Sequence, residues 1–369
     1  MGKKTFRFCL LFLINIGLVY ASGEKEGIEK LQTPAVISSK QVKSVKLGGK
    51  LEIRYEDPQS KAGTLKMYKF EPFVEAEIND NITMKGQVFF GTEKTEVNDG
   101  WIQYKKFPLV GGSLKAGRFR RKSFGLPQDE EGRVSIDYSL TGRAFTGDRQ
   151  VGLEYSGSFG SIVNINMGMF NGSLTGDREA GEVDTASTTA AKFVADKSGN
   201  TDTNQNKDIA VRVTVNPLKG LQAGGSFLSG KLSPADISKI NGYTAASYTS
   251  DKKERMSGDI MYKSNIFDFK AEYIQGKTSD LKVNSWYSLV ILKGVFDEFD
   301  IYARYSELRP DIDLNEAKSY TWRLYQTTTG LIWNLNSFTK LQGDYDFNHE
   351  GLSSKIKNDI LRVRWITNF

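Results

Sequence analysis

The segment DILRVRWITNF, residues 359–369, alternates apolar and cationic side chains from Leu361 to Trp365. Leu361, Val363 and Trp365 fall on one parity, and two arginines fall on the other. Successive side chains of a β-strand point to opposite faces, so the segment predicts a strand with one apolar face and one cationic face. Such a strand does not belong in an apolar core. It fits a position between lipid and water.

The same alternation begins near residue 45 and continues through the chain. In SVKLGGKLEIRY, residues 44–55, the apolar side chains share one parity, and lysines, a glutamate and an arginine occupy the other. The spacing is not helical, and four charges exclude a strand buried on both faces. Further examples are ITMKGQVFF (82–90), RQVGLEY (149–155), IAVRVTV (209–215) and DIYARY (300–305).

Charged residues on the polar parity are expected to face an aqueous lumen, because water must meet one side of each strand. The predicted lumen-facing residues are Lys46, Lys50, Glu52, Arg54, Glu75, Glu77, Arg212, Arg362 and Arg364.

Short turns and long polar connections follow one another along the chain. Short turns are predicted at 79–81, 108–112, 157–160, 216–219, 264–266, 294–297 and 334–337. Longer connections are predicted at 56–64, 91–99, 120–148, 171–206, 230–254, 276–283, 307–317 and 348–357. Seven hairpins plus the first and last strands make about sixteen strands. The fold class predicted is therefore all-β, a transmembrane antiparallel β-barrel with short periplasmic turns and long extracellular loops. A soluble β-sandwich also alternates, but it rarely needs so many strands.

The first residues resemble an export signal more than a structural element. A basic start, a short apolar run and a small-x-small site predict a cleaved signal peptide over 1–21. Residues 22–44 are expected to be irregular, and 45–369 to form the barrel in the bacterial outer membrane. The only cysteine lies in the leader, which excludes disulfides and thiolate sites from the remainder.

The charge balance argues against a nucleic-acid partner. The leader holds three of the 50 Lys and Arg residues, so 47 remain against 44 acidic residues, a net charge of about +3. His349 is the only histidine and falls in a predicted loop, and no phosphate-binding glycine loop precedes a helix. We therefore expect no enzyme activity, no cofactor and no metal site.

Four stretches resemble one family, the phosphate-selective porin O/P family of bacterial outer-membrane channels. They are DGWIQYKKFPLVGGSLKAGRFRRKSFG (99–125), GDRQVGLEYSGSFG with NINMGMFNGS (147–173), KDIAVRVTVNPLKGLQAGGSF (207–227) and KAEYIQGK (270–277). The resemblance covers most of the chain after the leader, and the order of the stretches is more specific than any one of them.

The resemblance implies a sixteen-stranded homotrimer whose third loop folds into the lumen and narrows the pore. That loop corresponds to about 120–148. The basic residues expected to line this constriction are Arg118, Arg120, Arg121, Lys122, Arg133, Arg143 and Arg149. Rings of Arg and Lys favour anions. Acidic residues in the same loop and lumen weaken that preference.

These observations predict a water-filled porin for passive diffusion of small hydrophilic solutes, with a mild preference for anions and phosphate as one candidate solute. The alternative is a barrel whose long loops bind a partner outside the cell, as in an adhesion protein. Lipid and the barrel assembly machinery are the other expected partners. An aromatic last residue resembles the signal that this machinery recognises, so Phe369 is expected to act in assembly.

Overall fold

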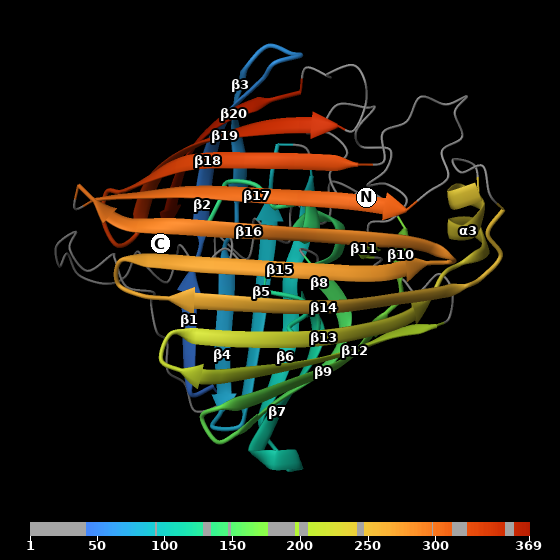
Figure 1. The fold of residues 1–369 in the computed structure, drawn as a ribbon. Coiled ribbons are helices and arrows are strands. Elements are labelled where there is room, and N and C mark those ends of the chain that lie inside the picture. The colour runs from blue at the N-terminus through green and yellow to red at the C-terminus, as the bar shows by residue number, and fades with distance from the viewer. Residues whose placement is uncertain are drawn as a thin grey trace, which may run out of the picture.

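The computed structural model describes residues 42–92, 94–127, 134–146, 149–175, 196–198, 206–241, 247–296, 298–311, 323–350 and 358–369. Figure 1 shows one antiparallel barrel, with strands β12 to β19 across the near wall and β2 to β8 across the far wall. The predicted signal peptide and almost all of the predicted irregular segment 22–44 lie outside the described residues.

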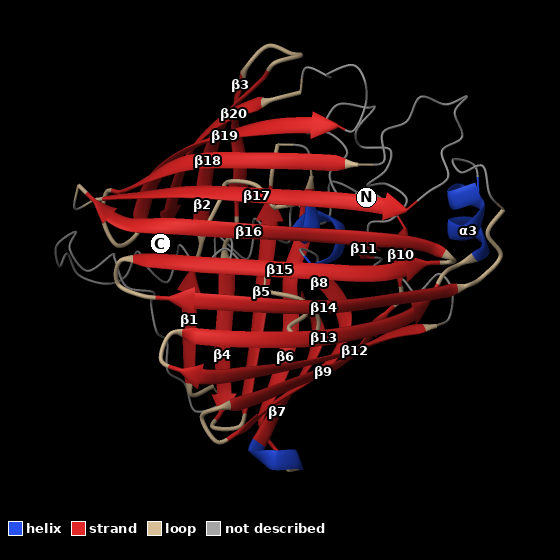
Figure 2. Ribbon diagram, in the orientation of Figure 1, coloured by secondary structure: helices blue, strands red, loops and turns tan. Residues whose placement is uncertain are grey.

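Strands account for nearly all the regular structure of the described residues (Figure 2). The strands in the first half are β1 (Ser44–Gly48), β2 (Lys50–Pro58), β3 (Thr64–Phe70), β4 (Phe73–Asn79), β5 (Ile82–Phe90), β6 (Thr95–Phe107), β7 (Gly112–Arg120), β8 (Arg149–Phe159), β9 (Val163–Asn171), β10 (Ser173–Thr175) and β11 (Asp196–Ser198). Those in the second half are β12 (Lys207–Leu218), β13 (Leu221–Lys231), β14 (Lys252–Lys263), β15 (Phe267–Thr278), β16 (Leu281–Val295), β17 (Phe299–Asp311), β18 (Leu324–Asn334), β19 (Thr339–Glu350) and β20 (Ile360–Asn368).

The main sheet contains 18 of these strands, which form a closed barrel of 16 strands. Each of these 16 barrel strands is called a stave, because two of them are made of two consecutive shorter strands. Strands β1 and β2 are one stave interrupted at Gly49, and β3 and β4 are one stave interrupted at Glu71 and Pro72. The barrel closes where β20 pairs with β2 in antiparallel register, with Arg54 opposite Arg364. Closure removes the exposed edges that an open sheet would present to lipid. The predicted fold class is confirmed.

The strands are longer than the sequence pattern suggested. Residues 276–283 were expected to form a long connection, but β15 and β16 extend through them and leave only a two-residue turn. Ser279 adopts a left-handed φ of 58° in that turn. Similarly, His349 lies within β19 and not in a loop, with its ring 5.9 Å from that of Tyr325.

Helical structure in the described residues lies in the connections. One α-helix, α3 (Pro234–Asn241), lies at the end of the barrel opposite the C-terminus (Figure 1). It starts with a cap at Ser233, whose hydroxyl accepts a hydrogen bond from the Asp236 amide over 3.2 Å and donates one to the Asp236 carboxylate over 2.7 Å. A 3-10 turn (Leu109–Gly111) joins β6 to β7, and a π-helical turn (Gly142–Thr146) precedes β8. No described helix is long and apolar enough to cross a membrane.

Candidate functional site

The two faces of the barrel wall differ in chemistry. On β15, Lys270 and Glu272 are 4% and 2% exposed and face inward, whereas Phe267 and Tyr273 on the opposite parity are 39% and 46% exposed. A soluble protein buries its apolar side chains and exposes its charges. This barrel does the reverse, which fits a wall with lipid outside and charged groups inside.

Part of the connection between β7 and β8 lies inside the barrel, and we call residues 121–127 and 134–146 the inner loop. Its backbone donates hydrogen bonds to side chains of distant strands: Leu126 N to Glu272 Oε1 (2.6 Å) and Ile136 N to Asp344 Oδ2 (2.9 Å). Since buried amides need acceptors, these inward carboxylates hold the loop against the β13 to β20 side of the wall.

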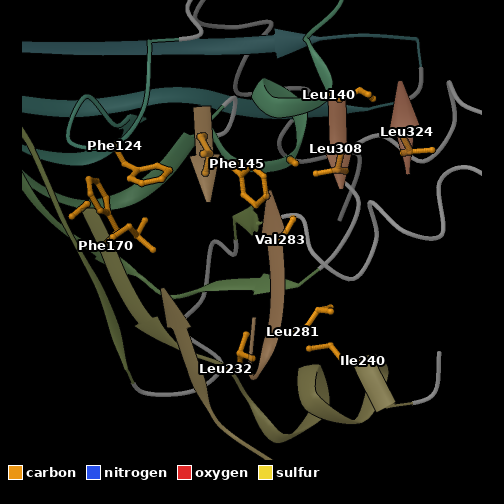
Figure 3. Close-up of a cluster of buried hydrophobic side chains, with 14 of the residues drawn as sticks. Phe124, Leu140, Phe145, Phe170, Leu232, Ile240, Leu281, Val283, Leu308 and Leu324 are labelled. Atoms are coloured by element: carbon orange, nitrogen blue, oxygen red, sulfur yellow. The ribbon is translucent and has the colours of Figure 1, made fainter. Parts of the chain in front are cut away.

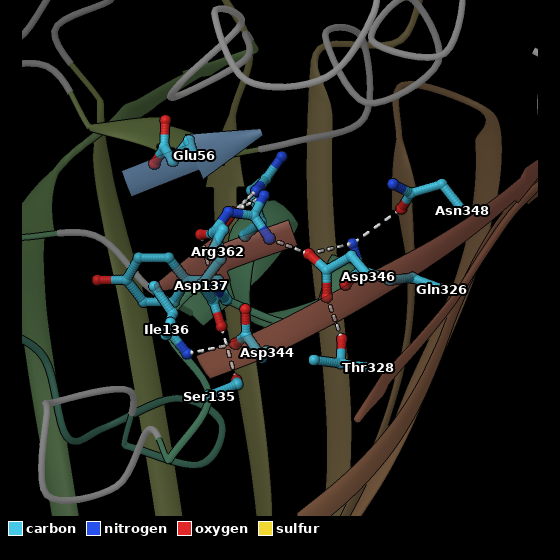
Figure 4. Close-up of polar contacts among 12 residues, drawn as sticks. Glu56, Ser135, Ile136, Asp137, Gln326, Thr328, Asp344, Asp346, Asn348 and Arg362 are labelled. Carbon is cyan, nitrogen blue, oxygen red and sulfur yellow. Dashed lines mark hydrogen bonds and ion pairs between the residues drawn. The ribbon is translucent and has the colours of Figure 1, made fainter. Parts of the chain in front are cut away.

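An ionic cluster fixes the middle of the inner loop (Figure 4). Asp137 accepts hydrogen bonds from Arg143 of the same loop and from Arg362 of β20, the latter over 3.4 Å. Arg362 also pairs with Asp346 of β19, which accepts a hydrogen bond from Thr328. All of these side chains are buried, so each charge depends on its neighbours for compensation.

Arg304 of β17 extends the same cluster. Its guanidinium donates to the Asp137 carbonyl over 2.7 Å and to Gln326 over 2.7 Å. Arg304 therefore donates hydrogen bonds both to the backbone of the inner loop and to β18. This bridge connects the loop to the barrel independently of the Asp137 carboxylate.

Apolar side chains hold the two ends of the inner loop (Figure 3). Phe124 and Phe145 are 1% and 2% exposed and belong to a buried cluster that includes inward side chains such as Val283 and Leu308. Burying large apolar side chains is the main favourable term in packing. The inner loop thus covers a partly apolar region of the β12 to β18 wall.

The basic residues predicted for the constriction have different surroundings. Arg121 is buried and donates to Gln150 over 3.2 Å, and Arg143 is buried beside Asp137. Arg120 donates to the Tyr138 hydroxyl over 2.7 Å, and Arg149 donates to Asp99 over 2.7 Å.

The other three constriction residues differ again. The Arg118 guanidinium lies 3.8 Å from the Glu96 carboxylate. Its neighbour Phe119 packs inside the barrel, so Arg118 starts from the opposite face of β7. Lys122 has an exposed side chain, and its backbone amide donates to Glu154 over 2.7 Å. Arg133 lies outside the described residues.

The predicted lumen-facing residues of the first strands share one face of the sheet. In the register of β1 with β4, Lys46 lies opposite Glu75 and Ser44 lies opposite Glu77. Lys50 lies across from Asn368 of β20, at the end of the closing seam.

Glu52 and Arg54 are buried on β2 and form an ion pair at 2.7 Å. Arg212 of β12 forms a two-fold hydrogen bond with Asp259 of β14 at 2.5 and 2.8 Å, and Arg364 of β20 donates to Gln342 of β19 over 2.7 Å.

The sequence interpretation missed several inward residues on β4 to β7. Phe73, Lys85, Trp101 and Lys115 share the face of Glu75, because Glu75 pairs with Lys85, and Lys85 with Trp101. The signal available was their parity with neighbouring charges.

The described staves, their short turns and an inner loop held within the lumen can be compared with solved structures. The chain has the fold of the outer-membrane porins. It resembles the outer membrane channel DcaP of Acinetobacter baumannii, with a TM-score of 0.64 and 10% identity over 91% of this chain and 100% of that one.

It also resembles the anion-selective porin from Comamonas acidovorans, with a TM-score of 0.59 and 13% identity over 88% and 99% of the two chains. A third is the trimer form of OmpT, an outer membrane protein of Vibrio cholerae, with a TM-score of 0.58 and 10% identity over 88% and 99%.

Sequence comparison adds no assignment to this porin fold. No protein-family model and no curated protein matches the chain. Membership of the phosphate-selective O/P family therefore stays a prediction. Among the described residues, no group of three or more His, Cys, Asp or Glu side chains is arranged to hold a metal ion.

Proposed function

We propose that this chain forms a water-filled channel in the bacterial outer membrane, through which small hydrophilic solutes diffuse passively. The observation that carries this proposal is the reversed wall, apolar outside and charged inside, in a closed barrel. Solvent also reaches part of the inner face: Phe73, Glu75 and Lys85 keep intermediate exposure, whereas inward residues of β14 to β19 are largely buried. We propose that solutes pass along the β1 to β7 side.

The inner loop supports a size limit on this passage. Its backbone bonds to carboxylates of β15 and β19, and its apolar cluster reaches as far as Phe119 of β7 and Trp101 of β6. The charged inner faces of β1 to β5 are then the side that remains for the passage. We propose that residues 120–148 form the constriction, in which Arg120 contacts Tyr138 of the inner loop and Arg149 contacts Asp99 of β6. Arginine presents a planar fork of donors suited to oxyanions, phosphate included.

The anion preference should be mild. Lys85 and Arg149 share Asp99, at 3.2 and 2.7 Å, and Lys66 pairs with Glu56 at 2.7 Å. Pairs of opposite charge largely cancel in the electrostatic potential along the pore. The preference for anions over cations therefore depends mainly on charged groups that form no ion pair.

We further propose that the chain works as a homotrimer and catalyses no reaction. The trimer form of the Vibrio cholerae protein with the same fold supports the first point. Insertion by the barrel assembly machinery and recognition of Phe369 also remain proposals. In the structure the Phe369 ring stacks on Phe70 at 5.9 Å.

Conductance of the purified protein in planar lipid bilayers tests the channel. We expect current steps of constant size that scale with salt concentration, and a reversal potential in a KCl gradient showing modest anion preference. Added phosphate that reduces chloride current more than sulfate does would support phosphate as a solute. Absence of steps from correctly folded protein would refute the channel and favour a surface-binding barrel.

A further inference from the structure

Five inward side chains on adjacent staves alternate between a cation and an aromatic ring, and we call them the lysine–aromatic row. They are Lys46 on β1, Phe73 on β4, Lys85 on β5, Trp101 on β6 and Lys115 on β7. The strand registers place them in this order around the inner wall, since Gly48 pairs with Phe73 and Lys85 with Trp101. The row crosses the β1 to β7 wall, and at its Trp101 end the indole packs against the buried cluster that includes Phe124 and Phe145 of the inner loop.

Each ring in the row has a lysine ammonium near its face. The Nζ atoms of Lys46 and Lys85 lie 6.0 and 5.2 Å from the centre of the Phe73 ring. The Nζ of Lys115 lies 4.4 Å from the centre of the Trp101 ring. At these separations a cation is attracted by the π-system, so the rings help to hold the ammonium groups in position.

Two lysines of the row form no ion pair among the described residues, although each lies opposite a carboxylate in the strand register, Lys46 opposite Glu75 and Lys115 opposite Glu154. Lys85 pairs with Asp99 at 3.2 Å, whereas the ammonium groups of Lys46 and Lys115 lie over aromatic rings. Lys115 has only intermediate exposure, between Trp101 and the Phe119 ring. A partly buried ammonium that forms no direct ion pair is incompletely compensated, and an anion entering the lumen would compensate it further.

The position of Trp101 is unusual for this barrel. The other tryptophans of the described residues, Trp286, Trp333 and Trp365, are 36–50% exposed on the outer face, where aromatic girdles meet headgroups. Trp101 faces inward with intermediate exposure, beside charged neighbours. An indole in this place offers a flat apolar surface to a solute.

We infer that the row around Trp101 and Lys115 is a binding subsite for small organic anions that carry a flat ring, with aromatic carboxylates as the solute class. The solute ring stacks on Trp101, and its carboxylate pairs with the Lys115 ammonium. Glu75, which pairs in register with Lys46 and Lys85, limits the subsite to one negative group by repulsion. The inference rests on the proposed channel function.

Two measurements with benzoate as the probe test this subsite. In bilayers, benzoate should reduce the chloride current at concentrations at which acetate does not. Trp101→Ala should raise the half-blocking benzoate concentration about three- to tenfold, which corresponds to a ring contact of roughly 0.7–1.4 kcal/mol. Lys115→Gln should weaken benzoate block and lower the anion preference, whereas Trp286→Ala, on the outer face, should change neither.

Equilibrium dialysis of benzoate against the detergent-solubilised protein gives a readout that does not need conduction. Binding that weakens in Trp101→Ala is expected. Conduction with equal effects of benzoate and acetate, or with no effect of Trp101→Ala, would overturn this inference alone. Benzoate binding by a protein that does not conduct would instead overturn the channel.

Discussion

Asp137 links the inner loop to the barrel wall. It is 3% exposed and accepts from Arg143 of the loop and Arg362 of the wall. Both arginines are themselves buried, so removing the carboxylate leaves two cations with reduced compensation. Breaking a buried ion pair on one side costs about 3–5 kcal/mol, which exceeds the stability expected of a single loop segment.

Asp137→Asn should therefore loosen the inner loop while the barrel stays folded. We expect larger current noise and a larger mean conductance in single-channel records, because the lumen widens when the loop leaves the wall. Asp80→Asn, at an exposed turn, is the matched control and should leave the current unchanged. Identical conductance and noise for Asp137→Asn and wild type would show that the loop does not narrow the passage.

Another charged contact, at the β4–β5 turn, should matter little. Lys43 Nζ lies 2.5 Å from Asp80 Oδ1, and both side chains are exposed. The hydrogen bond to Lys43 lowers the pKa of Asp80, and the hydrogen bond to Asp80 raises the pKa of Lys43. The stability from Asp80 is thus present above its unfolded pKa and lost as the pH falls through the lower folded value. That from Lys43 is lost as the pH rises through its raised value.

Between these limits, from roughly pH 5 to pH 9 given ordinary pKa values near 3.9 and 10.4, the pair should contribute a constant and small amount. We expect the melting temperatures of Asp80→Asn and wild type to differ little across this range. A difference that changes steeply between pH 6 and 8 would contradict the assignment.

At the scale of elements, the strands were predictable and the inner loop was not. Alternation is local, so Leu361, Arg362 and Val363 already reveal a two-faced strand in the sequence. The docking of the loop depends on contacts such as Ile136 with Asp344, 208 residues apart, which no periodicity encodes. The resemblance placed the loop near 120–148, but it could not tell that Arg121 and Arg143 are buried.

The apolar ends of the inner loop should control its attachment separately from the ionic cluster. Phe145 is 2% exposed within the cluster that joins the loop to β12–β18. Phe145→Ala should cost about 3–5 kcal/mol of packing, enough to detach the loop locally. We expect proteolytic cleavage within 121–146 to accelerate while the barrel remains resistant to heat in detergent.

An outer-face aromatic provides the control for this packing experiment. Phe227, 45% exposed on β13, should be replaceable by alanine without faster cleavage of the loop. Equal cleavage of Phe145→Ala and wild type would mean that the ionic cluster alone holds the loop.

At the scale of the whole molecule, one buried carboxylate lies at the seam where the last strand of the barrel pairs with the first. Glu52 of β2 is 0% exposed, and its Oε1 accepts from Arg54 over 2.7 Å. Its Oε2 lies 3.5 Å from Lys69 of β3 and 3.8 Å from Arg364 of β20. One side chain therefore neutralises cations from three staves at the place where the last strand meets the first.

Glu52→Ala should weaken this seam. It leaves Arg54, Lys69 and Arg364 close together without their common anion, at a cost of up to about 3–5 kcal/mol. Heat-modified migration in detergent gels should show that the variant unfolds at a lower temperature than wild type. At 25 °C the barrel should still close, because the backbone hydrogen bonds between Phe369 and Gly49 remain. Glu75→Ala removes an inward carboxylate with only intermediate exposure and no ion pair among the described residues, so it should unfold near the wild-type temperature. Equal unfolding temperatures for Glu52→Ala and wild type would mean that backbone pairing alone seals the barrel.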